Sequence, residues 1–199
     1  MSLMVRVSYL LPHRFLSRLA LFAARWRFRP WKNFMIGFIA KRFGVDWSEA
    51  EVSDIERFEH FNAFFTRALK PGVRPLGAAP VLMPADGRVS QAGPVAAGRI
   101  VQAKGRDYSL AELLADADLA QQFEGGVFAT IYLSPKDYHG AHMPAAGVLV
   151  ETRHVPGRLF SVSPSAVNTV PSLFARNERL VCRFDSEFGP MAVVMVGAL

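Results

Sequence analysis

Two short segments carry the side chains best suited to proton transfer. Asp86 lies in MPADG at 83–87, where proline and glycine frame a turn between two apolar runs. His139 and His142 lie three positions apart in YHGAHMP at 138–144, after another apolar run. A histidine that acts as a base, with an aspartate to orient it, is suited to activating a nucleophile. Asp86, His139 and His142 are therefore our candidate catalytic residues.

The same residues allow other interpretations. An aspartate between proline and glycine is also typical of a plain turn. Two histidines at this spacing could ligate a metal, but a metal site needs further ligands. The remaining candidates stand in unrelated contexts: His13, His60, His154 and Cys182. We therefore expect no metal.

A third polar cluster, FARNER at 174–179, lies beside an apolar run. Arginine suits phosphate because its planar guanidinium can donate two parallel hydrogen bonds. Arg176 and Arg179 are therefore candidates for contact with an anionic headgroup. An ion-paired turn is the alternative.

The first 45 residues carry nine lysines and arginines and no acidic residue. Helical spacing places apolar residues on one face, namely Leu11, Phe15, Leu19, Phe22 and Trp26, and it places Arg14, Arg18, Arg25 and Arg29 along the flank of that face. Such arginines can reach lipid headgroups while their stems lie on apolar surface. We expect peripheral docking on anionic lipid through Arg14, Arg18, Phe22, Arg25 and Trp26. Packing on the protein's own core and a mitochondrial transit peptide are the alternatives.

The rest of the chain alternates helical and strand patterns. Pro30 should end the first helix, a second follows from Trp31, and a capping box at 53–56 predicts a third that runs to Leu69. Beyond residue 80, short apolar runs separated by glycine and proline predict strands at 81–83, 88–92, 100–103, 127–133, 147–154, 180–184 and 191–196, with one helix at 109–122. The fold class is therefore α+β. It comprises a helical membrane-associating head at 1–75 and a β-rich catalytic domain at 76–199, which we expect to be incomplete at its C-terminus.

Composition excludes several classes of protein. Hydrophobic residues make up 51% of the chain, which suits a packed core, and a single cysteine excludes an internal disulfide. The formal charge of +6 divides into +9 for residues 1–45 and −3 for the remainder. Because the β-rich part is net acidic, we expect no nucleic-acid binding.

Eight motifs occur in a fixed order along the whole chain. They are FNAFFTR at 61–67, MPADG at 83–87, KGRDYSL at 104–110, YLSPKDYH at 132–139, HMP at 142–144, VPGRLFSV at 155–162, LFARNER at 173–179 and EFGPMA at 187–192. This series closely resembles phosphatidylserine decarboxylase proenzymes of the bacterial, membrane-associated type.

The resemblance implies a pyruvoyl-dependent lyase of phospholipid biosynthesis. Such a proenzyme cuts itself before a serine in a Leu-Gly-Ser-Thr motif, and that serine becomes a pyruvoyl group. The pyruvoyl ketone condenses with the amine of phosphatidylserine and takes up electrons as CO2 leaves, so that phosphatidylethanolamine forms. By the same resemblance, His142 takes the proton of the serine hydroxyl and Asp86 holds the imidazole. His139 handles a proton during decarboxylation, and Phe160 and Ser161 belong to the substrate pocket.

The resemblance also implies partners and a location. The partners are phosphatidylserine, the anionic cytoplasmic face of the cell membrane and a pyruvoyl-bearing small subunit from the same proenzyme. A homodimer is left open. The chain has Gly140 where the family often has arginine and Ser163 where asparagine is common, which puts anion contact and pocket hydrogen bonding at these positions in doubt.

Leu-Gly-Ser-Thr does not occur in the 199 residues. We therefore interpret the chain as most of the large, non-pyruvoyl subunit and expect it to be inactive by itself. The alternative is a truncated, non-catalytic membrane-lipid-binding protein.

Overall fold

A computed structural model describes residues 13–198, with the side chains of 15–198. These residues group into two compact units. One comprises Val89–Thr130 and the described residues from Ala146 to Ala198, with the described residues up to Ser17 grouped with it, and the other comprises Arg18–Arg88 and Ile131–Ala145. The second unit, which we call the helical unit, therefore joins the region of the expected head to the segment that carries His139 and His142. Whether the functional division lies at residue 75 stays a prediction.

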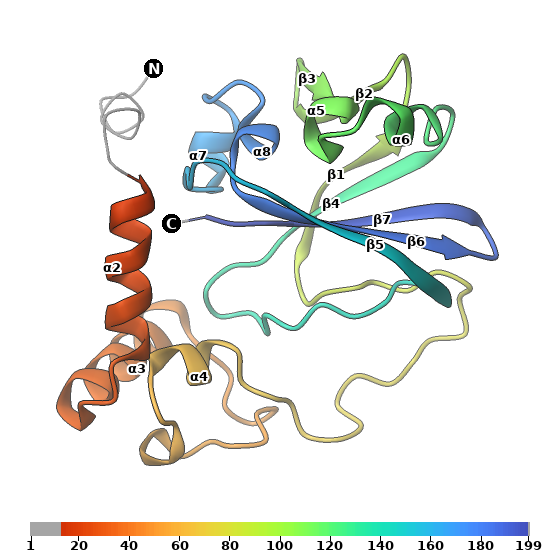
Figure 1. Cartoon of the computed structure of the whole chain (residues 1–199). Coiled ribbons are helices and arrows are strands. Elements are labelled where there is room, and N and C mark those ends of the chain that lie inside the picture. Colours follow the sequence, from red (N-terminus) through yellow and green to blue (C-terminus); the bar gives the residue numbers. More distant parts are fainter. Residues whose placement is uncertain (1–12, 199) are drawn as a thin grey trace. The chain divides into compact units, whose positions relative to one another are not determined.

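The helical unit contains α2 (His13–Arg25) from Arg18 onward and all of α3 (Arg29–Phe43) (Figure 1). Pro30 lies in the first turn of α3, where its missing N–H costs no hydrogen bond, so the expected break between two helices is confirmed. No helix within residues 13–198 has both the length and the apolar character needed to cross a bilayer.

The core of this unit forms around α3. Lys32, Ile36 and Ala40 recur every four residues and are the buried residues of the helix. Ile36 packs in a cluster with two buried aromatic rings, Phe58 and Phe64. The Lys32 ammonium is satisfied inside, because Nζ donates to the carbonyl oxygen of Ile55 at 3.0 Å.

The predicted third helix is wrong as one continuous element. The chain forms a short 3-10 turn, η1 (Ile55–Arg57), and a separate helix, α4 (Phe61–Phe65). Asp54 caps η1 through its side chain, and His60 caps α4 by accepting a hydrogen bond from Ala63 N at 3.0 Å. The two caps break the helix because Phe58 between them adopts an extended conformation and is buried in the core.

The β-rich unit contains three small sheets. β1 (Arg88–Pro94) pairs with β4 (Val127–Tyr132), and β2 (Arg99–Ala103) pairs with β3 (Arg106–Ser109). The third sheet has the order β5 (Gly147–Val155), β6 (Arg179–Ser186) and β7 (Gly189–Val196), all antiparallel. Helices α5 (Leu110–Leu114), α6 (Ala117–Gln121), α7 (Pro164–Val167) and α8 (Leu173–Arg176) complete the unit. The α+β class is thus confirmed.

Local hydrogen bonding and backbone conformation explain where the observed elements differ from those expected from the sequence. Residues 81–83 form no strand, and β3 was not anticipated. The helix expected at 109–122 divides into α5 and α6 because Ala115 adopts the left-handed conformation with φ 53°. Asp116 then caps α6 by accepting a hydrogen bond from Leu119 N at 2.8 Å.

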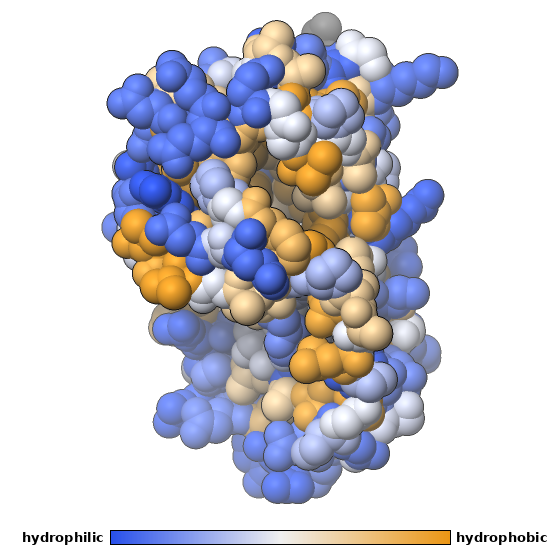
Figure 2. Space-filling model, turned by 90° about the vertical axis from the view of Figure 1, so that its right-hand side faces the viewer, coloured by the Kyte–Doolittle hydropathy of each residue, from blue (hydrophilic) through white to orange (hydrophobic). Residues whose placement is uncertain are grey.

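Edge strand β5 exposes apolar residues near its start. Val148, Leu149 and Val150 are exposed, as is Phe188 in the turn between β6 and β7. Figure 2 views the molecule from the side of these strand ends and shows hydrophobic residues between hydrophilic ones. The register of β5 against β6 shifts between Leu149 and Glu151, and such a bulge interrupts an edge that another strand could otherwise pair with.

Two buried amide side chains organise the loop between β5 and β6. Gln102 donates to the carbonyl oxygens of Val167 and Val170 and accepts from Leu173 N. Asn177, fully buried, accepts from Phe160 N at 3.0 Å and donates to Phe160 O at 2.8 Å. Each amide side chain therefore supplies hydrogen-bond partners to backbone N–H and C=O groups that have none in a helix or sheet.

Close approach at Gly157 generates a stability prediction. A Cβ there would lie 2.5 Å from Asn177 C, 2.5 Å from Glu178 N and 2.6 Å from Arg176 O, all rigid backbone atoms. Gly157→Ala should therefore lower the free energy of unfolding by about 1–3 kcal/mol. In Gly37→Ala, the control, the new methyl group meets no atom within 4 Å in mid-helix and should stabilise by about 0.5–1 kcal/mol. Urea unfolding measures both, and equal midpoints for the two variants would contradict the steric argument.

Candidate functional site

The segments that carry Asp86 and His142 run side by side in the helical unit. Leu82 N donates to Pro144 O at 2.7 Å, and His142 N donates to Pro84 O at 2.7 Å. These two bonds have the spacing of an antiparallel pair, although neither segment is a strand. Two residues far apart in sequence are therefore carried on adjacent backbone.

Gly87 fixes the other end of the Asp86 turn. A Cβ at this position would lie 2.5 Å from Ile131 Cγ2 and 2.7 Å from Tyr132 O. Only glycine permits so close an approach to the end of β4. Because residues 133–142 continue directly from that strand end, β4 anchors both candidate segments.

The Asp86 carboxylate is bound by Arg74. Arg74 Nε lies 3.0 Å and 2.8 Å from the two carboxylate oxygens, and Nη2 also donates to Oδ2. The same guanidinium donates to Glu49 at 2.9 Å and 2.7 Å. Hydrogen bonding to the two carboxylates raises the pKa of Arg74, and the bond from Arg74 lowers the pKa of Glu49. No hydrogen bond joins Asp86 to the His142 ring in the part of the chain that the structure describes.

The exposed His142 ring lies beside Tyr138, with ring centroids 5.7 Å apart. Tyr138 can lie there because position 140 is glycine: a Cβ at Gly140 would be 2.1 Å from atoms of the tyrosine ring. The departure noted at Gly140 therefore has a steric consequence for the surroundings of His142.

His139 is half-buried against Phe65, with ring centroids 4.0 Å apart. Nδ1 lies 2.8 Å from Asp137 O, and because a carbonyl oxygen only accepts, Nδ1 carries the hydrogen. Nε2 is then the position that takes up a further proton. Burial lowers the pKa of His139 and the charge of Arg67 lowers it further, whereas the contacts with Asp137 oppose the shift. The ring is therefore biased toward its neutral form.

Arg67 supports the loop that carries His139, and our sequence reasoning did not single it out. The residue is buried, Nη2 donates to Lys136 O at 3.0 Å, and its guanidinium carbon lies 5.3 Å from the centre of the Phe64 ring. Burial lowers the pKa of this arginine. Arg67 belongs to the FNAFFTR motif, and this membership was the signal in the sequence from which its role could have been anticipated. Arg74 stands in no quoted motif, and nothing in the sequence pairs it with Asp86.

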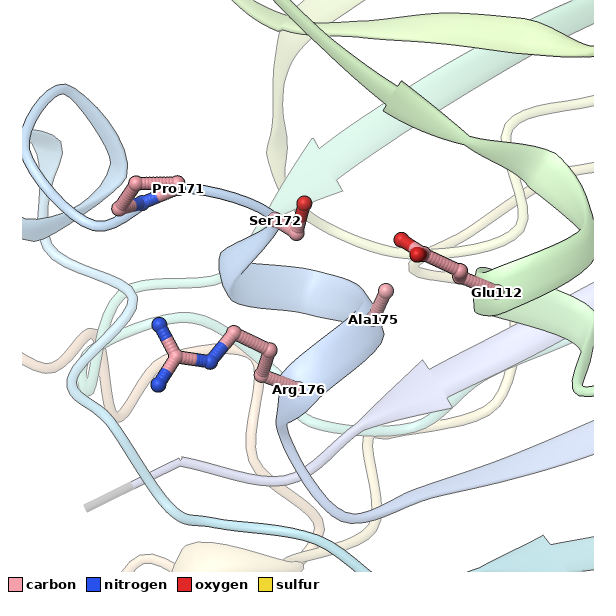
Figure 3. A pocket seen from close by; sticks show the side chains of 5 residues that line it. All are labelled: Glu112, Pro171, Ser172, Ala175 and Arg176. Atoms are coloured by element: carbon pink, nitrogen blue, oxygen red, sulfur yellow. The ribbon is translucent and has the colours of Figure 1, made fainter.

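The predicted substrate-contacting residues lie in the β-rich unit. Phe160 is a core residue, 1% exposed, and the guanidinium carbon of Arg176 lies 5.1 Å from its ring centre, whereas Ser161 is exposed. Arg176 also lines an open cavity of about 460 Å³ with Glu112, Pro171, Ser172 and Ala175. Figure 3 shows Arg176 extending from α8 on the side of Pro171, while Glu112 projects from α5 toward Ser172.

Arg179 has a different environment. It is 4% exposed, and its guanidinium donates to four backbone carbonyl oxygens, those of Glu112, Leu113, Ala175 and Asn177. In this arrangement its donors hold the end of α5 and the turn after α8 together. Because the Arg179 guanidinium is bound to backbone carbonyl oxygens of the protein itself, we leave this residue out of the substrate site proposed below.

The expected membrane-facing residues of α2 are exposed as far as they are described. Phe22 is 65% exposed and Trp26 46%, and both line an open groove of about 530 Å³ with Arg18, Leu21, Arg25 and Arg27. Leu11 and the side chain of Arg14 lie outside the described residues. Whether this exposed apolar face contacts lipid or another part of the protein stays a prediction. Among the described residues, no group of three or more histidine, cysteine or carboxylate side chains is placed to hold a metal ion.

Comparison with known proteins gives a consistent picture along the chain. The family model described as phosphatidylserine decarboxylase matches residues 61–199, and a second model, described as PSD, matches residues 3–44. A phosphatidylserine decarboxylase proenzyme of Xanthomonas axonopodis pv. citri is 61% identical over 201 residues, covering 100% of this chain and 72% of the relative. One of Pseudomonas aeruginosa is 62% identical over 194 residues, covering 96% and 67%.

The environment of His139 predicts a pH dependence of stability. Because its pKa is lowered in the folded chain, the unfolded chain holds more protons below the ordinary histidine pKa of about 6.5. The free energy of unfolding should therefore fall as the pH drops below about 6.5, with the full contribution present above it. NMR titration of the His139 ring protons, with the chain in urea as reference, tests the shift. A folded-state pKa at or above the urea value would contradict it, and His139→Gln should flatten this part of the stability profile.

Proposed function

Because the chain belongs to the phosphatidylserine decarboxylase family, we propose that it supplies the acid–base residues of a pyruvoyl-dependent enzyme that converts phosphatidylserine to phosphatidylethanolamine. The observation that carries the proposal is the backbone pairing of 82–84 with 142–144, within a chain about 60% identical to named decarboxylase proenzymes. The relatives are named proenzymes, which supports as partner a second chain that is cut from the same precursor and bears the pyruvoyl group.

The chemistry of His142 and Asp86 suits the formation of a pyruvoyl group from a serine. The exposed His142 ring can accept the hydroxyl proton as the serine oxygen attacks the preceding carbonyl carbon. An aspartate that accepts from the other ring nitrogen would fix the tautomer and stabilise the imidazolium. The adjacent backbone supports this role for Asp86, and the role further requires a contact with the His142 ring that the described residues do not make.

His139 is suited to the decarboxylation step. When present, a pyruvoyl ketone condenses with the substrate amine and accepts the electron pair released with CO2. The lowered pKa of His139 biases the ring toward its neutral form, and Nδ1 donates to Asp137 O, so Nε2 can take a proton and deliver it later. A lowered pKa makes the protonated ring the stronger acid, which favours delivery of that proton to carbon.

We assign contact with the phosphate headgroup to Arg176 and Ser161. Arg176 lines the cavity of the β-rich unit and lies over the ring of Phe160, and Ser161, the next residue, is exposed. The guanidinium suits a phosphate oxygen, and the serine hydroxyl can both donate and accept. α2 completes the proposal by docking the chain peripherally on an anionic membrane.

Self-cleavage of the full-length precursor tests the catalytic assignment. His142→Ala should leave the precursor uncut, and Asp86→Asn should slow cutting by several orders of magnitude, because a misoriented imidazole is a poor base. Gel electrophoresis of radiolabelled precursor measures the two products over time. Normal cutting of the His142→Ala precursor would refute the assignment and favour a non-catalytic lipid-binding protein.

Vesicle flotation tests the membrane assignment. A juxtamembrane arginine contributes about 1 kcal/mol at an anionic surface, so Arg18→Gln combined with Arg25→Gln should weaken binding by about 10- to 30-fold. The vesicles contain phosphatidylcholine with or without phosphatidylglycerol, and added salt should reduce binding.

The matched control for this experiment removes two exposed arginines outside α2, in Arg88→Gln combined with Arg106→Gln. This pair should bind like the unchanged chain. Equal losses in the two double variants would show that only net charge matters, and equal binding to both kinds of vesicle would refute anionic-lipid docking.

A further inference from the structure

Arg74 uses every donor that a guanidinium has. Nε lies within hydrogen-bond distance of both oxygens of Asp86, and Nη2 donates to Asp86 Oδ2 and Glu49 Oε2. Nη1 donates to Glu49 Oε1 at 2.9 Å and to Val73 O at 2.9 Å. Five N–H groups thus meet two carboxylates and one carbonyl, a saturation that holds the side chain in one geometry.

Glu49 ties this arrangement to ordered backbone. Lys70 N donates to Glu49 O at 2.9 Å, and Ala50 and Leu69 form an antiparallel bridge. Ala50 is 1% exposed, so the segment that carries Glu49 lies on packed structure. Arg74 therefore links the turn of Asp86, which has no regular secondary structure, to a segment that is hydrogen-bonded and packed.

The charge of Arg74 also offsets the repulsion between the Asp86 and Glu49 carboxylates. Asp86 and Glu49 bind the same guanidinium, and without it two carboxylates held this close would repel each other. The Asp86 side chain is 27% exposed, so solvent screens that repulsion only in part.

We propose that Arg74 is a positioning residue for self-cleavage, which holds Asp86 as an oriented anion on the backbone next to His142. The inference rests on the proposed function. Arg74 leaves Asp86 able to act, because each carboxylate oxygen has two lone pairs and Oδ1 receives a single bond, from Nε. Oδ1 is therefore the oxygen that accepts the N–H of the His142 ring when the pair forms.

The experiment compares cutting rates of full-length precursors. Arg74→Gln, which is neutral and too short to bridge the two carboxylates, should slow cutting by about 10- to 100-fold, because a displaced carboxylate no longer orients the base. Arg74→Lys should recover part of the rate, since an ammonium restores the charge but not the parallel bonds to two carboxylates. Guanidinium added to Arg74→Ala, below denaturing concentrations, should raise the rate, and it should do nothing for Asp86→Asn.

Arg153 supplies the matched control, because it too bridges two carboxylates, Asp116 at 2.9 Å and Glu151 at 2.8 Å, but in the β-rich unit. The Arg153→Gln precursor should cut itself at nearly the rate of the unchanged precursor. Its melting temperature should change about as much as that of the Arg74→Gln precursor. Equal slowing in the Arg153 and Arg74 variants would assign the effect to stability and overturn the proposal, as would slowing at Arg74 that neither lysine nor guanidinium relieves.

The failure of this inference is distinguishable from failure of the proposed function. Unchanged cutting in Arg74→Gln, with Asp86→Asn and His142→Ala precursors uncut, would overturn the role of Arg74 alone. Normal cutting in Asp86→Asn and His142→Ala would overturn the proposed function itself. Should Arg74→Ala not fold, the glutamine and lysine variants still decide between these outcomes.

Discussion

The hydrogen bonds from Leu82 N to Pro144 O and from His142 N to Pro84 O are the constraint on which the candidate site depends. Neither segment belongs to a sheet, and these two bonds, together with the packing of Gly87 against the end of β4, hold the aspartate turn beside the histidine loop. The arrangement places chemical groups on irregular backbone that regular structure anchors at both ends. This is a common way to combine precise placement with room for a reacting chain.

Arginines organise this site in two different ways. Arg74 is half-exposed and satisfies all its donors on carboxylates and a carbonyl, so its contribution is orientation together with charge. Arg67 is buried beside an aromatic ring, and its charge adds to the effect of burial, which is the main reason that the pKa of the neighbouring His139 is lowered. One cation thus binds and orients a carboxylate, while the other adds to the burial that disfavours a protonated histidine.

Sequence patterns predicted those parts of the fold that depend on local rules. Six of the seven expected strands form, and proline and glycine positions marked their ends. Continuous helices were wrong where a cap competes with helical periodicity, as at His60 and Asp116, because both residues accept from the backbone three positions on. Asp86 and His142 were recognisable from their motifs. Arg74 was not, because its partners lie 12 and 25 positions away and are brought to it only by the folded turn.

The tyrosine ring folded over Gly140 makes two positions of the chain interdependent. Any side chain at 140 would occupy the space of the Tyr138 ring, so the two residues cannot be exchanged one at a time without displacing the ring from His142. A homologue with arginine at this position must direct its aromatic residue elsewhere, and a graft of one loop residue between such proteins would carry an epistatic penalty. The observed position of the Tyr138 ring is therefore possible only in the background of glycine at 140.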